Sequence, residues 1–463
     1  MWHWLKTHPQ HLLVAILLFA FCTRIYNLGT PSRYIFDEVY HAVTAKLISR
    51  NDPAAYEWWN PAPEPNTAVD WLHPPLAKYT QAASMLAFGE NAFGWRFSSA
   101  VFGTLVILMT YLLAKSLFKN EALALGAAGL ASLDGLLLVQ SRIAMNDIHV
   151  TFFILLTLWC YLEYRARAFS TKWLVLTGLS AGLAISSKWS GAFVIGIVAV
   201  FEGVRLLRQK PLQLSRSLIV QTAFSLFILP VLLYVLSYSH MFIQGKTLVC
   251  NEETPIQGEC YYERFTWRDN TWFEGYVSHF VELHHQIWYY QTHLEATHGY
   301  QSRPGQWLLN LRPVWYHVEY AESGKIANIY AFGNPLLFWF GVVAVIMTIL
   351  YLLEHLKHRT EAKWPLTFLL ASYLAVWTPW QLSPRIMFFY HYTPAVPLLS
   401  IILAYWLLRL WNYPHPSKVP KSAAALIAGG IVVTFILWLP HWVGIPVTKA
   451  FADQLYFAFS TWK

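Results

Sequence analysis

The run GNPLLFWFGVVAVIMTILYLL at 333–353 contains no charged residue, and it is long enough to cross a bilayer core as a helix, which takes about 20 apolar residues. Backbone polar groups in lipid must pair within the protein, so an uninterrupted run of this kind predicts a helix. Further runs with few or no charges lie at 11–28, 95–114, 122–141, 148–164, 172–187, 189–204, 217–239, 364–380, 388–408 and 422–440. The sequence therefore predicts an all-α polytopic membrane protein with about 11 transmembrane helices.

The composition of the whole chain agrees with this interpretation. Of 463 residues, 56% are hydrophobic and only 13% are charged, about half the charged share of an ordinary soluble domain. The 23 Trp, 26 Tyr and 29 Phe suit long aromatic belts at the membrane interfaces. This composition excludes a disordered chain, a collagen-like fibre and a small disulfide-rich domain.

The positions of Lys and Arg predict the orientation. With the N-terminus inside, basic residues such as Lys115 and Lys119 collect on the inner side, as the positive-inside rule requires. The short outside turns then hold only Arg142, Lys188 and Arg385. The net charge of +8 is thus a topology signal, and no nucleic-acid partner is expected.

This orientation divides the chain into three parts: residues 1–239 with a long outside loop at 29–94, a second outside loop at 240–332, and residues 333–463 with an outside tail from about 441. The first span is expected to be a retained signal anchor. Cys22 and Cys160 fall in spans. Cys250 and Cys260 fall in the second loop, where a disulfide and two separate thiols are equally open.

Three stretches of the outside loops are amphipathic, and they are predicted to be helices: Val39 to Ser49, Pro74 to Phe88, and roughly Trp272 to Glu295. In the second stretch an apolar face recurs from Leu76 to Leu86, with Lys78 and Gln81 off that face. This stretch is too short to span, so it is predicted to lie along the membrane surface.

Candidate chemistry begins with the adjacent carboxylates of Asp37 and Glu38, directly after the first span. One interpretation is that they favour the positive end of a helix dipole. The other is that one carboxylate faces a cavity at the membrane surface and accepts a proton from an incoming hydroxyl. The pair alone does not decide between them.

The three outside cations could converge on a phosphate, to which Arg gives bidentate bonds. Chance placement at the interface is the alternative. Asp134, inside the third span, either has a function or binds a helix-capping partner. His391, beside Tyr390 and Tyr392, is typical of interfacial packing.

The second outside loop carries His284, His285, His293 and His298, but their spacing matches no HExxH-type metal site. Its interleaved aromatic residues favour stacking on a sugar or holding an extended peptide. The sequence shows no Gly-rich phosphate loop and no nucleotide-binding pattern. A sugar donor would therefore be linked to a lipid.

Six segments in order resemble the protein O-mannosyltransferases, which have the GT-C glycosyltransferase fold. They are FDEVYH (36–41), WLHPPLAKY (71–79), SRIAMND (141–147), SKWSG (187–191), THGYQSRPGQW (297–307) and FFYHYTPAVP (388–397). The resemblance runs from about 30 to 410.

The resemblance implies transfer of mannose from polyprenyl-phosphate mannose to Ser or Thr of secreted or membrane proteins, with inversion at the anomeric carbon. Asp37 and Glu38 would be the catalytic pair. The donor phosphate would be bound by Arg142, with Lys188 and Arg385. Substrate-binding residues within or beside the motifs would be His73, Lys78, Asp147, His298, Tyr300, Arg303 and His391, with Gly299 where the family commonly has Pro.

The second outside loop, at 240–332, is too short for the β-trefoil domain of eukaryotic members. A bacterial enzyme of the inner membrane is therefore expected, active on the outer side with a bacterial polyprenol. No cofactor is expected, a divalent metal is left open, and the partners would be the lipid-linked donor, protein acceptors, membrane lipids and potentially a second copy.

Two other functions compete with this interpretation. One is a GT-C transferase with a lipid or glycan acceptor, such as an aminoarabinose transferase, against which THGYQSRP (297–304) favours a protein acceptor. The other is a transporter, which would show broken helices and ionisable residues near the midplane. The polar residues concentrate instead in the two outside loops. A membrane assembly or structural role is the remaining alternative.

Overall fold

The computed structural model describes residues 9–57, 62–208, 216–240, 246–250, 260–264, 272–321, 324–357 and 360–463. Each predicted span coincides with a helix or a pair of helices in these ranges. They are α2 (Pro9–Ile25), α5 (Ala92–Phe118), α6 (Glu121–Ser132) with α7 (Gly135–Gln140), α8 (Asp147–Ala166), α9 (Thr171–Ser187), α10 (Phe193–Leu207), α11 (Arg216–Ala223) with α12 (Leu229–Ser237), α16 (Pro335–Glu354), α17 (Lys363–Trp377), α18 (Ala395–Trp411) and α19 (Val419–Val443).

Several of these helices are long and apolar enough to cross a membrane. Within the described ranges, five helical stretches meet both conditions: Ala92–Phe118, Trp189–Leu207, Arg216–Ser237, Pro335–Glu354 and Val419–Val443. The helices Pro9–Ile25, Glu121–Ser132 and Ala395–Trp411 are apolar but shorter. The chain is an integral membrane protein, and the number of 11 spans stays a prediction.

The amphipathic stretches form the predicted helices α3 (Glu38–Ser49), α4 (Leu76–Phe88) and α14 (Trp272–His293). Shorter helices are α15 (Pro304–Trp307) and α20 (Lys449–Phe451), and single turns of other helix types are η1 (Pro53–Tyr56), η2 (Trp189–Ala192), η3 (Phe224–Ile228), η4 (Thr378–Leu382), η5 (Phe389–Tyr392), η6 (Ala452–Tyr456) and η7 (Ser460–Trp462).

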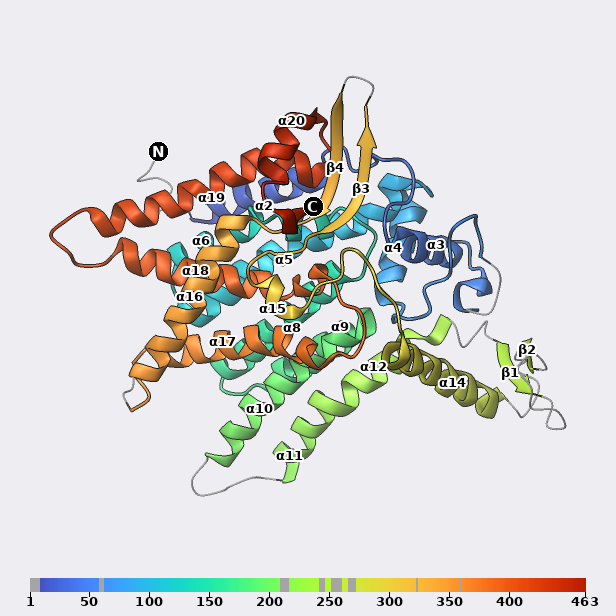
Figure 1. The fold of residues 1–463 in the computed structure, drawn as a ribbon. Helices are drawn as coiled ribbons and strands as arrows, with labels where there is room; N and C mark the ends of the chain where they lie inside the picture. The colour runs from blue at the N-terminus through green and yellow to red at the C-terminus, as the bar shows by residue number, and fades with distance from the viewer. Residues whose placement is uncertain are drawn as a thin grey trace.

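Two small antiparallel sheets accompany the helices. The strands β1 (Lys246–Cys250) and β2 (Cys260–Arg264) pair with Cys250 opposite Cys260. The strands β3 (Val314–Tyr320) and β4 (Lys325–Ala331) form a hairpin, to which β5 (Val447–Thr448) adds at the β4 edge. Figure 1 shows this hairpin projecting from the helical body, with α20 beside it.

Asp134 separates α6 from α7, and it caps the second of these helices. Its Oδ1 accepts a hydrogen bond from the Leu137 N–H at 2.8 Å, and its Oδ2 accepts one from the Asn334 N–H at 3.0 Å. Asp at an N-cap satisfies backbone donors that have no partner inside the helix. Of the two interpretations of this carboxylate, the structure confirms the capping one.

Helix α4 buries its polar face. Lys78 and Gln81 are 1% and 0% exposed, whereas Leu86 is 73% exposed. Leu76 and Tyr79 of the apolar face are half-buried. The C-terminal part of this face, with Ala83 and Leu86, is exposed and available to lipid, as expected of a helix that lies along a membrane. That placement stays a prediction, but the inward face of α4 brings Lys78 to the residues of the candidate site.

One large hydrophobic cluster extends from Ala20 to Trp462, and it includes residues of all three predicted parts of the chain. Small residues allow close helix contacts: a Cβ on Gly178 of α9 would lie 1.8 Å from the Ser225 carbonyl oxygen. A second cluster holds α14 against the first outside loop through residues such as Leu283, Tyr56 and Val69. The division at 239 and 333 stays a prediction.

Candidate active site

The carboxylates of Asp37 and Glu38 lie where the chain turns into α3, with Asp37 at the N-cap position. Phe36, just before them, has a φ of 48°, in the left-handed region that bulky residues rarely adopt. Its ring stacks on Tyr316 of β3, with the ring centroids 4.3 Å apart. The β3–β4 hairpin therefore holds the strained residue that aims the two carboxylates, and strain of this kind concentrates at functional sites.

Glu38 is fully buried, and both of its carboxylate oxygens are occupied. The Arg96 guanidinium donates Nε to Oε1 at 2.8 Å and Nη2 to Oε2 at 2.7 Å. The backbone N–H groups of Ile35 and Ala144 donate to the same oxygens, at 3.0 and 3.1 Å. The contact with Ala144 brings the turn at 141–147 against Asp37 and Glu38. Glu38 therefore has the geometry of a positioning residue.

The Asp37 side chain is partly buried, and Tyr390 lies near it. Burial raises the pKa of Asp37 to about 6, although His41 and Lys188 oppose this rise. A carboxylate with a pKa near neutrality has the basicity that a general base needs.

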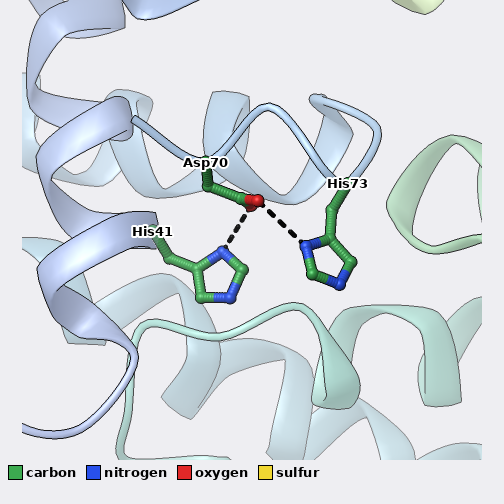
Figure 2. A group of neighbouring side chains, drawn as sticks. All are labelled: His41, Asp70 and His73. Carbon is green, nitrogen blue, oxygen red and sulfur yellow. Dashed lines mark hydrogen bonds and ion pairs between the residues drawn. The ribbon is translucent and has the colours of Figure 1, made fainter. Parts of the chain in front are cut away.

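A third carboxylate, Asp70, lies at the centre of a buried network (Figure 2). Its Oδ2 contacts His41 Nδ1 at 2.8 Å, and its Oδ1 contacts His73 Nδ1 at 3.0 Å. Lys78 Nζ lies 2.8 Å from Oδ2. Although burial opposes ionisation, Lys78, His73 and His41 hold the pKa of Asp70 well below its usual range. Burial lowers the pKa of His73 to about 4, although Asp70 opposes this fall.

Sequence reasoning missed Asp70. It directly precedes the segment WLHPPLAKY and stands three residues before His73, a spacing that could have signalled the pair. His41, in the first motif, was likewise not singled out. The fold brings the two motifs together, because α3 packs beside α4.

His41, Asp70 and His73 are the group of described residues whose ligand atoms could hold a metal ion, since those atoms lie within 4.8 Å of one another. Imidazole and carboxylate suit Zn²⁺ or a similar cation. Lys78 Nζ already lies 2.8 Å from the Asp70 carboxylate and neutralises its charge. The positive and negative charges of this Asp–His–Lys cluster are therefore balanced by its own side chains. The histidines of the second outside loop have other contacts: His284 Nε2, for example, lies 2.6 Å from the Tyr234 hydroxyl.

A cavity of about 370 Å³ brings together several predicted site residues, among them Lys188 and Arg385. Lys188 Nζ lies 2.8 Å from Asp147 Oδ1 and 5.5 Å from the centre of the Tyr390 ring. The Arg385 guanidinium donates to Gln291, but its buried Nε has no hydrogen-bond partner. The remaining lining residues are Leu72, His73, Trp189, Ser190, Phe193, Trp288, Gln291, Thr292, Pro379, Trp380, Ser383, Pro384 and His391.

This lining combines two cations with apolar and aromatic walls. Such a combination suits a phosphate that carries a long apolar chain. The His391 ring packs against Trp380 at the cavity wall, with the ring centroids 4.2 Å apart. His391 therefore has the aromatic packing that the sequence indicated, in addition to its place in the cavity lining. The polar ends of Lys188 and Arg385 are the features of this cavity that can bind an anion.

Arg142 does not line this cavity. Its Nη1 donates to the carbonyls of Thr23, Arg24 and Tyr26 at 3.2, 2.9 and 2.7 Å, which are groups at the end of α2 without a partner inside the helix. Burial lowers the pKa of Arg142 to about 9. The sequence predicted three converging cations, and the structure brings together two. A contact of Arg142 with the donor phosphate stays a prediction.

A second cavity of about 760 Å³ adjoins the first, and the two share Ser383, Pro384 and Arg385. It is polar, and THGYQSRP residues such as Gln301 and Arg303 line it. The Ser302 N–H donates to the Met387 carbonyl at 2.9 Å, which fixes this motif against the chain before η5. His298 and Tyr300 lie beside the cavity, with the His298 ring 5.2 Å from that of Phe388.

Two family models match most of the chain. The model described as dolichyl-phosphate-mannose-protein mannosyltransferase matches residues 14–243, and the model described as the C-terminal four-TMM region of protein-O-mannosyltransferase matches residues 276–462. A polyprenol-phosphate-mannose–protein mannosyltransferase of Corynebacterium glutamicum is 27% identical, over 97% of this chain and 92% of its own length. The enzyme of that name from Mycobacterium tuberculosis is 23% identical, over 96% and 89%.

Solved structures show the same fold. The Saccharomyces cerevisiae protein O-mannosyltransferase Pmt1–Pmt2 complex bound to the sugar donor matches with a TM-score of 0.77 at 16% identity, covering 96% of this chain and 91% of that chain. ArnT from Cupriavidus metallidurans bound to undecaprenyl phosphate matches with a TM-score of 0.52 at 15% identity, covering 94% and 71%.

Proposed function

The chain belongs to the dolichyl-phosphate-mannose–protein mannosyltransferase family and has the GT-C fold, and we propose that it transfers mannose from a polyprenyl-phosphate donor to Ser and Thr hydroxyls of proteins. The reaction inverts the anomeric centre, and it takes place at the outer face of a bacterial inner membrane. The observation that supports this proposal best is that Asp37, a carboxylate with a raised pKa, interacts electrostatically with Lys188, which lines one cavity together with a second cation, Arg385.

The donor occupies the cavity of about 370 Å³. Its phosphate binds Lys188 and the unpaired Nε of Arg385, while the polyprenyl chain lies against the apolar wall. Lys188 is oriented by Asp147. His73, which Asp70 holds through Nδ1, turns its other ring nitrogen to a substrate, and Lys78 fixes Asp70. His391 forms part of the donor wall.

The acceptor polypeptide occupies the adjoining polar cavity, where Arg303 lies, and His298 and Tyr300 flank its path. The acceptor oxygen forms a bond to the anomeric carbon as the bond from that carbon to the phosphate oxygen breaks. The hydroxyl proton passes to Asp37, and the negative charge that develops on the phosphate is stabilised by the two cations. Glu38 and Arg96 hold Asp37 in position.

The direct test uses purified enzyme, radiolabelled polyprenyl-phosphate mannose and a Ser/Thr-rich peptide. We expect label on the peptide. Label on a lipid or glycan acceptor instead would favour the aminoarabinose transferase type of reaction, and uptake of substrate without transfer would favour a transporter.

The raised pKa of Asp37 predicts the pH dependence of the reaction. A general base acts in its ionised form, so kcat/KM for the peptide should be constant above about pH 6 and fall about tenfold for each pH unit below it. The measurement is a profile of initial rates from about pH 4.5 to 8. Because Lys188 favours ionisation of Asp37, Lys188→Met should move the midpoint to higher pH. A profile without a change near pH 6 would remove Asp37 from this role.

Donor affinity tests the two cations. Arg385→Met and Lys188→Met should each weaken donor binding about tenfold, since a hydrogen bond to a charged group contributes about 1.5 kcal/mol or more. Lys418→Met, at an exposed position on the predicted inner side, is the control with full affinity. Arg142→Met tests the remaining prediction: a loss of donor affinity like that of the other two variants would place Arg142 on the phosphate, and a loss of stability with unchanged affinity would limit Arg142 to its contacts with the end of α2.

A further inference from the structure

A third cavity lies on the opposite face of the β3–β4 hairpin from the catalytic segment. Its volume is about 280 Å³. The hairpin contributes three cross-strand pairs to this face: Trp315 with Tyr330, Val318 with Asn328, and Tyr320 with Ile326. Tyr300 closes one side, and residues Lys449, Ala452, Asp453 and Phe457 of the C-terminal tail close another. We call this cavity the hairpin cleft.

Aromatic rings form much of the wall of the hairpin cleft, and two of them, Trp315 and Tyr320, are exposed to solvent. Trp315 and Tyr320 are 38% and 75% exposed. The Tyr300 ring lies 6.1 Å from that of Trp315 and 6.4 Å from that of Tyr330. These rings form a rigid surface of the kind that stacks on the apolar C–H face of a sugar.

Polar groups of three kinds surround the rings. Asn328 is only 3% exposed, and its Nδ2 has no hydrogen-bond partner. A buried amide donor without a partner costs free energy, which a ligand oxygen in the cleft would recover. Lys449 and Asp453, both exposed, add a donor and an acceptor at the rim. Aromatic faces with a few placed polar groups are typical of small-molecule sites, and this set matches the hydroxyls of a hexose.

The hairpin cleft also lies close to the reaction. On the other face of β3, Tyr316 stacks on Phe36, the residue before Asp37. Tyr300, which lines the cleft, is followed by Gln301, which lines the polar cavity assigned to the acceptor. A polypeptide that leaves the acceptor cavity past Tyr300 would reach the cleft.

We propose that the hairpin cleft binds a mannosyl group already attached to the acceptor, so that the enzyme holds a modified polypeptide while it modifies a further hydroxyl. This rests on the proposed function and adds a second sugar-binding site to it. The size of the cleft favours one sugar over an extended chain, for which the neighbouring cavity of about 760 Å³ offers far more room.

The test compares two peptides of one sequence, one unmodified and one with a single mannose on a Thr, using the full-length enzyme in nanodiscs. For the wild type we expect a KM several-fold lower for the mannosylated peptide. Trp315→Ala and Tyr320→Ala should raise that KM to the value for the unmodified peptide, without changing kcat or the KM of the unmodified peptide. Trp411→Ala, at a 46% exposed residue at the end of α18, is the matched control.

A second measurement needs no variant: methyl mannoside should raise the KM of the mannosylated peptide only, and methyl galactoside should do so less. Equal KM values for the two peptides in the wild type would overturn the proposal. A rise in both KM values in the variants would also overturn it and make the cleft a polypeptide site. Absence of transfer to the unmodified peptide would contradict the proposed function itself, which separates the two failures.

Discussion

Asp37→Asn should lower kcat for mannosyl transfer by about 10²–10⁴-fold, the usual range for loss of a general base. The amide keeps the size of the side chain, but it cannot take up the proton of the acceptor hydroxyl. Donor binding should be retained, because Lys188 and Arg385 are unchanged. The measurement is single-turnover transfer from radiolabelled donor to peptide, together with donor affinity of the same preparation.

Asp52→Asn is the matched control for this variant. Asp52 lies in the same segment of the chain, and its carboxylate accepts the Ala54 N–H at 3.0 Å, which an amide oxygen can also do. The Asp52→Asn variant should therefore keep full transferase activity. If Asp37→Asn retained wild-type turnover, the proton would have to pass to another group, and Asp70 would be the next carboxylate to examine.

Glu38→Ala should have its largest effect on stability. The change leaves the Arg96 guanidinium buried without its carboxylate, and removal of one partner of a buried pair costs about 3–5 kcal/mol. Arg96 also donates to the carbonyls of Leu28, Pro31 and Arg33, so its displacement would loosen the whole segment before Asp37. Thermal unfolding in detergent is the measurement, with transfer activity of the surviving folded fraction.

The double variant Glu38→Met with Arg96→Met provides the control. Replacement of both partners by apolar residues is often close to neutral, so the double variant should be more stable than Glu38→Ala. A Glu38→Ala protein with wild-type stability but no turnover would contradict the positioning role. It would support the catalytic role that the sequence predicted for Glu38.

The contrast between these neighbouring residues shows how far the sequence could go with the site. The sequence predicted that Asp37 and Glu38 belong to the active site, but it could not assign a separate role to each carboxylate. Arg96, whose guanidinium donates hydrogen bonds to the Glu38 carboxylate, is 58 residues away in the chain. Asp37 instead lies near Tyr390, a residue of the last motif, and near Lys188. Only packing between distant segments separates the two environments.

The sequence by itself determined the helices, their order and the family. Helix formation in lipid depends on the hydropathy of one contiguous segment, and each motif is likewise contiguous, so both can be recognised without knowledge of the rest of the chain. This is why every predicted span coincides with helices in the described residues, and why α3, α4 and α14 were predicted within a few residues.

The tertiary structure alone decided which side chains meet. It placed Lys188 and Arg385 in one cavity and Arg142 on the end of α2. It also joined Asp70 to His41 and Lys78, whereas the sequence could have signalled only the local pair of Asp70 and His73. The physical reason is that a charge buried in a low-dielectric interior takes its partners from whatever elements pack against it, and those elements come from segments far apart in the chain.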